Sequence, residues 1–353
     1  MVIIDGSYGE GGGQILRTSL TLAALTGKAV KIINIRAGRP KPGLAAQHLT
    51  GVRAVAEICG AHLEGAELGS QNLTFAPQRS PQAASYSWDV AAARKGGSAG
   101  AVSLAFQAVL LPMALAPSPS QVTLRGGTHV PWSPPYHYLE RVYLPTLARL
   151  GVRAKVEIDK WGWYPMGGGE IKAQIDPANL PLSPIDLKER GPLQGLFGLS
   201  AVSNLPDHIA QRQRKRALEM LGEFRPQIEV VRGESAGQGS FLFLWAQFEN
   251  CLAGFSSLGA RGKPAEKVAE EAGQEYLEYY HGGAALDKHL ADQLILPMAL
   301  ASGPSSFTTT EITPHLLTNI WVVRRFTPRR FKVEREKGQV TCYGPGREEK
   351  AYV

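Results

Sequence analysis

Apolar positions along this chain form blocks with helical spacing, each followed by a small-residue turn and a run rich in β-branched residues. Two of these blocks, LLPMALAPSPSQVT at 110–123 and ILPMALASGPSSFT at 295–308, match closely at a shift of 185 residues, from 110 to 295. A fainter block, ILRTSLTLAALTGKAVKI at 15–32, aligns with 105–123 at a shift of 90 residues, from 15 to 105. Helical apolar spacing followed by a β-branched run predicts a helix and then a strand. We therefore expect three copies of one α/β unit.

The copies are unevenly spaced, which indicates an insertion. The second interval exceeds the first by about 95 residues, from 90 to 185. The extra segment begins after the turn-rich loop PANLPLSP, near Pro184, and ends near Gly282, where HGGAALDKHLADQ follows. Inside it, LFGLSAV, QRQRKRALEMLGEF, IEVVRG, SFLFLWAQF and PAEKVAEEAGQEYLEYYH predict a strand, a helix, two strands and a helix.

The expected fold class is thus α/β (α+β), with a large domain of repeated units and a smaller α/β domain inserted before the third unit. The predicted boundaries are 1–183 for repeats one and two, 184–281 for the inserted domain and 282–353 for repeat three.

Three unlike polar residues occupy the same place in the three copies. Arg17, Gln107 and Asp292 each interrupt a helix that is otherwise apolar. Buried polar groups cost free energy unless they are paired. Either each residue has its own partner, or all three face one shared central site.

Composition and charge narrow the class of protein. The chain is 44% hydrophobic and 20% charged, which is ordinary for a soluble globular protein. No segment reaches about 18 uncharged apolar residues and the first residues lack a signal-peptide pattern, so we expect a cytoplasmic protein with no membrane partner. The three cysteines lie far apart, which argues against a disulfide framework or a zinc site. The net charge of +7 favours a polyanionic partner.

A glycine-rich loop, SYGEGGGQILR at 7–17, opens the first predicted helix. Backbone N–H groups of such a loop and the helix N-terminus can bind phosphate. The loop has no Walker A pattern, and Glu10 would repel phosphate unless a divalent cation bridged the two. We interpret Glu10 as a metal contact; the alternative is a flexible turn with a solvated glutamate.

A basic segment, IRAGRPKPGLAAQH at 35–48, follows the first predicted unit's second strand. Arg36 and Arg39 lie in a loop stiffened by prolines, followed by Gln47 and His48. Arginine binds phosphate through two parallel hydrogen bonds. The segment is either a clamp for a phosphate or an RNA end, or a solvated basic loop.

Two further loops combine glycine, proline and aromatic residues. RGGTHVPWSPPYHYLE at 125–140 could enclose a base between flat side chains, and WYPMGGGE at 163–170 repeats the glycine run that ends in glutamate. Both could equally be structural turns.

His315, in TTTEITPHLLTNI at 308–320, is the remaining candidate for chemistry. A lone histidine is most often a hydrogen-bonded residue in a buried turn. The chain has no nucleophile elbow, HxH or HExxH pattern, and Ile3 stands where a KxDG motif of a lysine-dependent nucleotidyl transferase would need its lysine.

Taken together and in order, these segments resemble the RNA 3′-terminal phosphate cyclase family. The matching segments extend over nearly the whole chain, and their number makes the resemblance more specific than any single glycine motif. They are DGSYGEGGGQILR, IRAGRPKPGLAAQHL, RGGTHVPWSPP, YPMGGGE, LGARGKPAEKVAEEA, HLADQLILPMALA and FTTTEITPHLLTN.

The resemblance implies a fold and a reaction. The large domain would contain three βαβαββ-type units like the C-terminal domain of translation initiation factor three. His315 would attack the α-phosphate of ATP, expel pyrophosphate and carry AMP. The AMP would pass to an RNA 3′-phosphate to give RNA(3′)pp(5′)A, and the neighbouring 2′-OH would then close a 2′,3′-cyclic phosphodiester and release AMP. The implied cofactors are ATP and Mg²⁺ or Mn²⁺, and the implied partner is RNA with a 3′-phosphate end.

The resemblance also implies residue roles. Glu10 would hold the divalent metal, and Asp292 would orient or polarise His315. Arg17, Gln107 and Gln293 would bind the nucleotide phosphates, whereas Pro134, Phe255 and His289 would enclose the adenine. The RNA terminal phosphate would be bound by Arg36, Arg39, Gln47 and His48.

The chain departs from the family pattern at three places. His289 stands where tyrosine is frequent, His137 where aspartate is frequent and Met166 where lysine is frequent. Three alternatives remain open: a noncatalytic family branch, which lacks the nucleophilic histidine; a small-metabolite transferase such as the enolpyruvyl transferases; and a passive RNA-end-binding protein.

Overall fold

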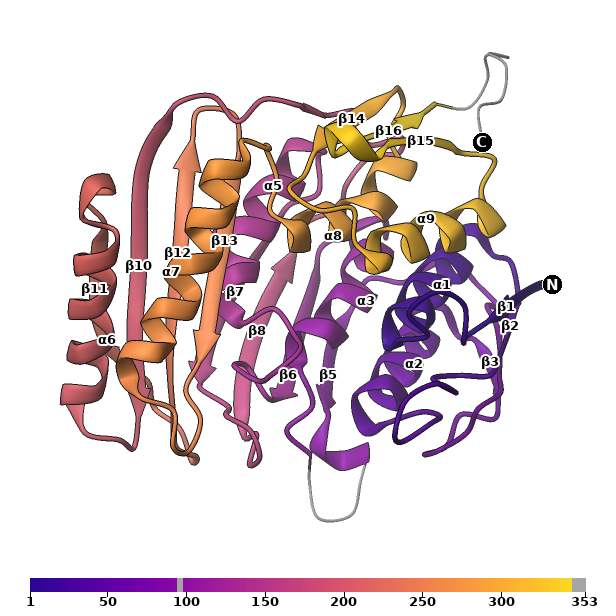
Figure 1. Cartoon of the computed structure of the whole chain (residues 1–353). Helices are drawn as coiled ribbons and strands as arrows, with labels where there is room; N and C mark the ends of the chain where they lie inside the picture. The colour runs from indigo at the N-terminus through magenta and orange to yellow at the C-terminus, as the bar shows by residue number, and fades with distance from the viewer. Residues whose placement is uncertain (94–97, 345–353) are drawn as a thin grey trace.

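The computed structural model describes residues 1–93 and 98–344 and contains four four-stranded sheets with helices packed on them (Figure 1). The first sheet has the order β1-β2-β4-β3, and β1 and β2 are parallel whereas the other pairs are antiparallel. Helices α1 and α2 connect its strands. The bounds are β1 (Val2–Asp5), α1 (Gly13–Thr26), β2 (Val30–Ile33), α2 (Ala46–Cys59), β3 (His62–Glu64) and β4 (Leu73–Ala76).

The second sheet repeats this arrangement with the order β5-β6-β8-β7, again with the first pair parallel. A π-helical turn interrupts the helix that leads to β7. The bounds are β5 (Ser85–Asp89), η1 (Ala91–Ala93), α3 (Val102–Ala114), β6 (Ser120–Gly126), α4 (Tyr136–Tyr138), η2 (Leu139–Tyr143), α5 (Leu144–Arg149), β7 (Ala154–Lys160) and β8 (Gly169–Ile175).

The third sheet combines a short early strand with the last part of the chain. Its order is β9-β14-β16-β15, and β9 and β14 are parallel whereas the other pairs are antiparallel. The three sheets therefore share one strand order and one set of strand directions. The bounds are β9 (Asp186–Leu187), α8 (Lys288–Ala299), β14 (Ser305–Thr308), α9 (Pro314–Phe326), β15 (Arg330–Glu334), η4 (Arg335–Lys337) and β16 (Gln339–Tyr343).

The fourth sheet is formed by the segment between β9 and α8 and has the order β11-β10-β12-β13. Helices α6 and α7 pack on each other and against its strands. The bounds are β10 (Leu193–Ser203), α6 (Asp207–Met220), η3 (Gly222–Phe224), β11 (Gln227–Arg232), β12 (Gly239–Phe248), β13 (Leu252–Leu258) and α7 (Ala265–Gly282).

Two details differ from the sequence predictions for this segment. Strand β9 lies inside the range 184–281 predicted for the inserted domain, yet it pairs with β14 in the third sheet. Strand β13 was missing from the predicted elements. Its sequence LAGFSSL contains glycine and two serines, so its β-propensity is low, and it is held by pairing with β12.

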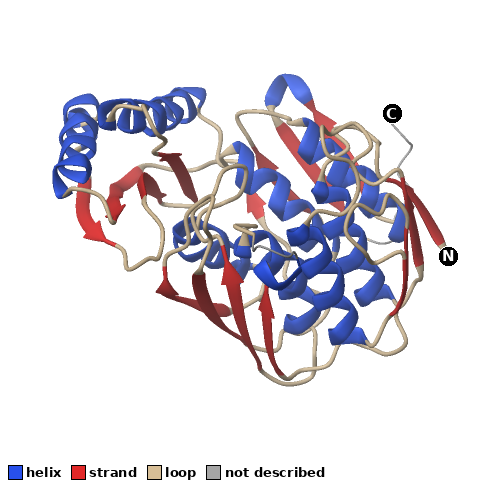
Figure 2. Ribbon diagram, turned by 90° about the horizontal axis from the view of Figure 1, so that it is seen from below, coloured by secondary structure: helices blue, strands red, loops and turns tan. Residues whose placement is uncertain are grey.

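The helices of the first three sheets gather together, and the fourth sheet with its two helices lies to one side (Figure 2). Helix α1 packs against α2, α3 and α9, and α8 packs against α9. Buried apolar residues from all four sheets form one continuous core. Within the described ranges, no helix has the length and apolar character needed to cross a membrane.

Candidate active site

The glycine-rich loop before α1 places the start of this helix close to two other segments. Gly12 is the N-cap residue of α1. A Cβ atom on Gly13 would lie 2.2 Å from His48 Nε2, and one on Gly9 would lie 2.5 Å from the Thr318 hydroxyl. These contacts explain the glycines, because a side chain at either position would collide with α2 or α9.

His315 lies in the first turn of α9, opposite α1. The hydroxyl of Thr313 accepts a hydrogen bond from Leu316 N at 3.1 Å and so caps this helix, and Pro314 occupies its first turn. The Gln14 side chain on α1 forms two hydrogen bonds with His315. Its Nε2 donates to the His315 carbonyl oxygen at 3.0 Å, and its Oε1 is hydrogen-bonded to His315 Nδ1.

These two bonds define the protonation of the imidazole. The His315 carbonyl can only accept, so the amide nitrogen of Gln14 must face it and the amide oxygen must face Nδ1. Nδ1 therefore carries the proton, and in the neutral ring the lone pair is on Nε2. In the free protein Nε2 lies 2.6 Å from Glu10 Oε2, a distance that requires a proton between the two atoms, so the lone pair becomes available when Glu10 moves away. Nε2 is therefore the ring atom that could act as a nucleophile.

The surroundings of His315 favour the neutral ring. Its pKa is lowered, first because burial disfavours the imidazolium and also because of the positive charges of Arg17 and Arg39, while Glu10 acts in the opposite direction. A neutral imidazole at physiological pH retains its nucleophilic lone pair.

The three polar residues that share one position in the sequence repeats lie in helices that meet at this site. Gln107 interrupts α3, whose other residues from Val102 to Ala114 are all buried, and its Nε2 donates to Gln293 Oε1 at 2.7 Å. Arg17 and Asp292 interact electrostatically: burial lowers the pKa of Arg17 to about 10, and Asp292 opposes this shift. Burial raises the pKa of Asp292 to about 7, and Arg17 opposes that shift.

The structure connects Asp292 with α9 through its backbone. Asn319 Nδ2 donates to the Asp292 carbonyl oxygen at 2.8 Å, and Thr18 donates to Asn319 Oδ1 at 2.7 Å. Among the described residues, the His315 ring is hydrogen-bonded to Gln14 and not to the Asp292 carboxylate. Sequence reasoning missed Gln14, Thr18 and Asn319; the one signal for Gln14 was a polar residue directly after the glycine run.

The start of α8 carries His289 beside a buried carboxylate that the sequence reasoning also missed. Asp287 caps α8 by accepting from His289 N and Leu290 N, both at 2.9 Å, and it accepts a hydrogen bond from Tyr138 at 2.9 Å. His289 Nε2 lies 3.4 Å from Glu275 Oε1. The pKa of His289 is raised because the hydrogen bond and charge of Glu275 outweigh the desolvation that acts against it.

The predicted phosphate clamp lies on the other side of the glycine loop. Arg39 forms an ion pair with Glu10, so the clamp and the His315 site share a contact. Arg36 donates to the Gly43 carbonyl at 2.8 Å, and Gln47 Oε1 accepts from Ala101 N at 3.1 Å.

His48 belongs to the same clamp and is buried behind the loop. Its Nδ1 accepts a hydrogen bond from Ala45 N at 3.2 Å. Burial, with smaller effects of Arg36 and Arg17, lowers its pKa to about 3, so His48 is neutral.

The two remaining adenine candidates are not joined to this cluster by a described contact. Phe255 is 2% exposed and packs on Tyr276 and Tyr279 with ring centroids 5.6 and 5.2 Å away. Pro134 is half-buried in the loop before α4.

Residues 1–93 and 98–344 contain no group of three or more histidine, cysteine or acidic side chains able to hold a metal on their own. The site can nevertheless accommodate a divalent cation that is shared with a substrate. Glu10 Oε2 is buried and receives no hydrogen bond of good geometry, which leaves acceptor capacity for a cation. Mg²⁺ is commonly bound by one or two carboxylates together with substrate phosphates.

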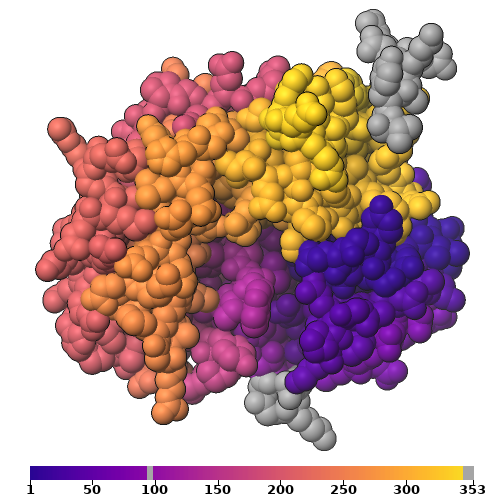
Figure 3. Space-filling model, in the orientation of Figure 1, coloured from indigo at the N-terminus to yellow at the C-terminus, as the bar shows by residue number. Residues whose placement is uncertain are grey.

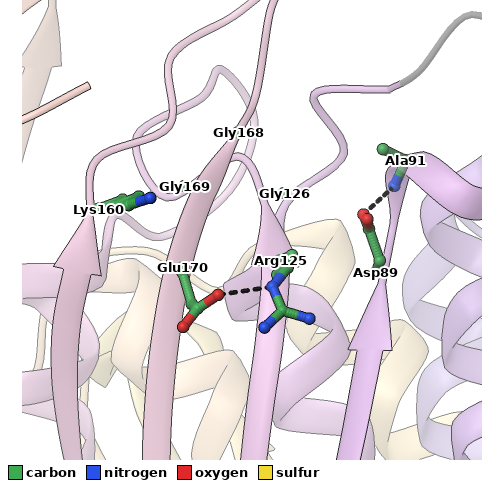
Figure 4. A pocket seen from close by; sticks show the side chains of 8 residues that line it. All are labelled: Asp89, Ala91, Arg125, Gly126, Lys160, Gly168, Gly169 and Glu170. Atoms are coloured by element: carbon green, nitrogen blue, oxygen red, sulfur yellow. Dashed lines mark hydrogen bonds and ion pairs between the residues drawn. The ribbon is translucent and has the colours of Figure 1, made fainter. Parts of the chain in front are cut away.

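The second glycine loop borders a separate hollow of about 180 Å³ at the ends of β6, β7 and β5 (Figure 4). Arg125 donates to Glu170 at 2.5 Å, and Asp89 accepts from Ala91 N at 2.7 Å. Lys160 has no ion pair among the described residues. The hollow is lined by Asp89, Ala91, Arg125, Gly126, Lys160, Gly168, Gly169 and Glu170.

A depression lies in the face of the molecule that Figure 3 shows. It is bordered by the N-terminal segments, the C-terminal segments and α7, and residues between β5 and β8 form its floor (Figure 3). The cluster around His315 is formed by α1, α8 and α9, which belong to two of these bordering parts.

Comparison with known proteins identifies the family. The family model described as RNA 3′-terminal phosphate cyclase matches residues 8–333. A protein of Methylococcus capsulatus named RNA 3′-terminal phosphate cyclase is 54% identical over 94% of this chain and 92% of its own length. A protein of the same name from Nostoc punctiforme is 51% identical over 94% of this chain and 96% of its own, and one from Pyrobaculum neutrophilum is 44% identical over 95% of each.

The chain therefore belongs to the RNA 3′-terminal phosphate cyclase family, and the resemblance drawn from its motifs is confirmed. Among solved structures, the enolpyruvyl transferase NikO from Streptomyces tendae has a TM-score of 0.27 at 14% identity, covering 62% of this chain and 38% of that chain.

Proposed function

We propose that this protein is an enzyme that uses ATP to convert an RNA 3′-terminal phosphate into a 2′,3′-cyclic phosphodiester. The observation that carries the proposal is the arrangement of His315 in a member of this family. Its Nδ1 is hydrogen-bonded to Gln14, and its Nε2 faces Glu10 within a cluster of positive charges. The class of reaction is a ligase-type nucleotidyl transfer.

In the first step, His315 Nε2 attacks the α-phosphate of ATP, a P–N bond forms and pyrophosphate leaves. Gln14 accepts a hydrogen bond from Nδ1 and so keeps the proton on Nδ1 and the lone pair on Nε2. A histidine nucleophile suits this step because it is neutral and nucleophilic near neutral pH and its bond to phosphorus stays reactive.

In the second and third steps, AMP moves from His315 to an oxygen of the RNA 3′-phosphate, and the RNA 2′-OH then attacks the activated phosphorus and releases AMP. Arg39 is suited to hold the terminal phosphate, because its guanidinium lies beside Glu10 and Gly12. Arg36, Gln47 and His48 would complete this clamp, while Arg17, Gln107 and Gln293 would bind the triphosphate.

Glu10 would hold the divalent cation beside the triphosphate. When bound, the cation neutralises negative charge on the phosphates. Glu10 would give up its contacts with Arg39 and His315 to hold the cation, which would leave Nε2 free to react and the guanidinium free for RNA phosphate.

The deciding experiment is incubation with α-labelled ATP and Mg²⁺ or Mn²⁺, followed by denaturing electrophoresis. Wild-type protein should retain acid-labile, alkali-stable label, and His315→Ala should retain none. Persistent label in the variant would exclude His315 as the nucleophile. Absence of label in folded, nucleotide-free wild type would favour the noncatalytic, RNA-binding alternative.

Glu10→Ala tests the metal assignment in the same assay. Removal of its carboxylate should shift the metal titration of the labelling step to higher concentrations. Glu229→Ala, which removes an exposed acidic residue from β11 in the fourth sheet, is the control. An unchanged titration in Glu10→Ala would count against its role.

We further propose that the large domain consists of three copies of one βαβαββ unit, like the C-terminal domain of translation initiation factor three. The shared strand order of the first three sheets supports this. Because β9 pairs with β14, the inserted domain would follow the first strand of the third unit, after Leu187.

A further inference from the structure

An aromatic surface lies on two adjacent loops between β6 and β8, and the proposed reaction gives its exposed side chains no role. Trp132 is 96% exposed, which is the largest exposure among the bulky apolar residues of the described chain. Tyr164 and Met166, on the second glycine loop, are 65% and 62% exposed. The two loops run side by side, since a parallel bridge joins His129 to Trp163.

The Trp132 loop is held in place, so this exposure is not the property of a free tail. Tyr136 N donates to the Thr128 carbonyl at 3.0 Å and closes the loop, and Ser133 donates to the Val130 carbonyl at 3.0 Å. Trp132 has φ of 60°, a conformation that is unfavourable for a bulky residue. A strained and solvated tryptophan on a fixed loop indicates a function, because neither feature stabilises the free protein.

This loop packs against a residue that pairs with the predicted phosphate clamp. Val130 packs with Ala101 and Leu104, and Ala101 N donates to Gln47 Oε1 at 3.1 Å. Trp132 therefore lies two residues after Val130, which packs against Ala101, the residue that is hydrogen-bonded to Gln47.

The loop also leads toward the His315 site. Helix α4 follows it directly, and Tyr138 of that helix donates to Asp287, the cap of the helix that carries Asp292. The loop is therefore linked both to the residue that pairs with Gln47 and to the helix that carries Asp292.

A lysine precedes the second loop, in a hollow that also contains Arg125 and the acidic residues Asp89 and Glu170. Lys160, at the end of β7, lines the hollow at the base of the loops, and Figure 4 shows it apart from the Arg125–Glu170 pair. Exposed aromatic side chains combined with a cation are typical of surfaces that bind single-stranded nucleic acid, since bases stack on the rings and phosphates pair with the cation.

We propose that Trp132, together with Tyr164, is a stacking surface for bases of single-stranded RNA upstream of the 3′-terminal phosphate. This inference rests on the proposed function and adds a specificity: the enzyme distinguishes RNA by the length of unpaired strand before its 3′ end. Lys160 contacts the backbone of the same strand.

The test measures binding of labelled oligoribonucleotides of two, four and eight residues that end in a 3′-phosphate. Trp132→Ala should raise the Kd of the octamer roughly tenfold and leave the dinucleotide almost unchanged, because loss of one stacked base typically costs about that factor. Trp132→Phe should retain most of the affinity. Tyr343→Ala, which removes an exposed aromatic residue from β16, is the matched control and should have no effect.

A second series locates the stacked base. An abasic residue is placed at each position of the octamer; at the stacked position it should weaken binding to wild type but not to Trp132→Ala. Lys160→Ala should reduce the slope of log Kd against log salt by about one.

Several outcomes would overturn the inference. An equal loss for dinucleotide and octamer would indicate a structural role for Trp132, and an unchanged octamer Kd would exclude stacking. A change in sedimentation without a change in RNA binding would assign the surface to contact between two copies of the chain. Labelling with AMP in the same preparations distinguishes failure of the stacking inference from failure of the proposed cyclase activity. If the wild type forms the AMP adduct and Trp132→Ala binds the octamer with unchanged Kd, only the stacking inference fails.

Discussion

Gln14 and His315, which are 301 positions apart in sequence, are joined by two hydrogen bonds that together determine which imidazole nitrogen carries the proton. The amide of Gln14 donates to the backbone of the histidine and accepts from its ring. The first bond fixes the orientation of the amide, and the amide oxygen then requires a proton on Nδ1. A single side chain on α1 therefore both positions the ring and directs its lone pair to Nε2.

Gln14→Ala should slow the proposed self-adenylylation roughly 10- to 100-fold, because the bonds that fix the orientation and the tautomer of the proposed nucleophile are lost. ATP binding should change much less, since Gln14 contacts the histidine. The measurement is single-turnover labelling with α-labelled ATP beside a nucleotide-binding titration. Gln227→Ala, which replaces an exposed glutamine on β11 in the fourth sheet, is the control. A rate loss that saturating ATP restores would show that Gln14 serves nucleotide binding instead.

Gly13 and His48 form a second close pair, and a Cβ at Gly13 would lie 2.2 Å from the ring nitrogen. Gly13→Ala should therefore displace His48 and lower the free energy of unfolding by about 1–3 kcal/mol, as overpacking commonly does. Adding His48→Ala creates room and should recover part of this loss, so the two changes should be non-additive. Denaturant unfolding of the two single variants and the double variant measures the coupling; additive effects would show that the predicted collision is relieved elsewhere.

Much of the fold could be predicted from the sequence because the repeats preserve apolar spacing. The helices around Gln107 and Asp292 are apolar enough that one polar residue in each stands out. Strand β13 was not predicted because its residues have low β-propensity and it forms through pairing with β12, which is a tertiary effect. The pairing of β9 with β14 was not predicted either, because β9 has only two residues and so shows no periodic pattern.

The candidate site could be predicted only where a residue type stands out locally. Glu10 within a glycine run and His315 within an apolar segment are conspicuous in this way. Gln14 is not, because glutamine is common in helices and its importance arises from contact with a helix 301 residues later. Asp287 gave no signal for the same reason; its contacts come from Tyr138 on another unit and from the start of its own helix.

Arg39 contacts Glu10 in the free protein, whereas the proposed reaction needs its guanidinium for the RNA phosphate. Arg39→Ala should thus weaken transfer of AMP to RNA roughly 10- to 100-fold, the range expected for loss of a charge-assisted pair. Formation of the His315 adduct should be affected much less. Arg39→Lys keeps the charge but not the two parallel hydrogen bonds, so it should restore only part of the transfer. Adduct formation and its discharge by RNA are followed in separate assays, and an equal loss in both would contradict separate roles.

Asp292 combines burial with a central position, and burial raises its pKa to about 7 from an ordinary 3.8. Between these two pH values the folded protein holds a proton that the unfolded chain has released, so stability falls as pH rises through this window. Asp292→Asn cannot ionise. It should raise the free energy of unfolding at pH 7 by on the order of 3 kcal/mol, since a tenfold difference in proton affinity between the folded and unfolded states corresponds to about 1.4 kcal/mol.

The gain from Asp292→Asn should shrink as pH falls toward 3.8 and vanish below it, where both states of the wild type are protonated. Asp5 is the opposite case, because hydrogen bonds from Ser7 lower the pKa of its exposed carboxylate. Asp5→Asn should therefore be neutral or slightly destabilising at pH 7. Urea unfolding of both variants at pH 4.5 and pH 7 provides the comparison. A stability gain for Asp292→Asn that is the same at both pH values would mean that the shape of the side chain, and not its ionisation, is the source. A gain that is larger at pH 7 and is accompanied by slower self-adenylylation would show that the protein keeps a destabilising carboxylate because the reaction needs it.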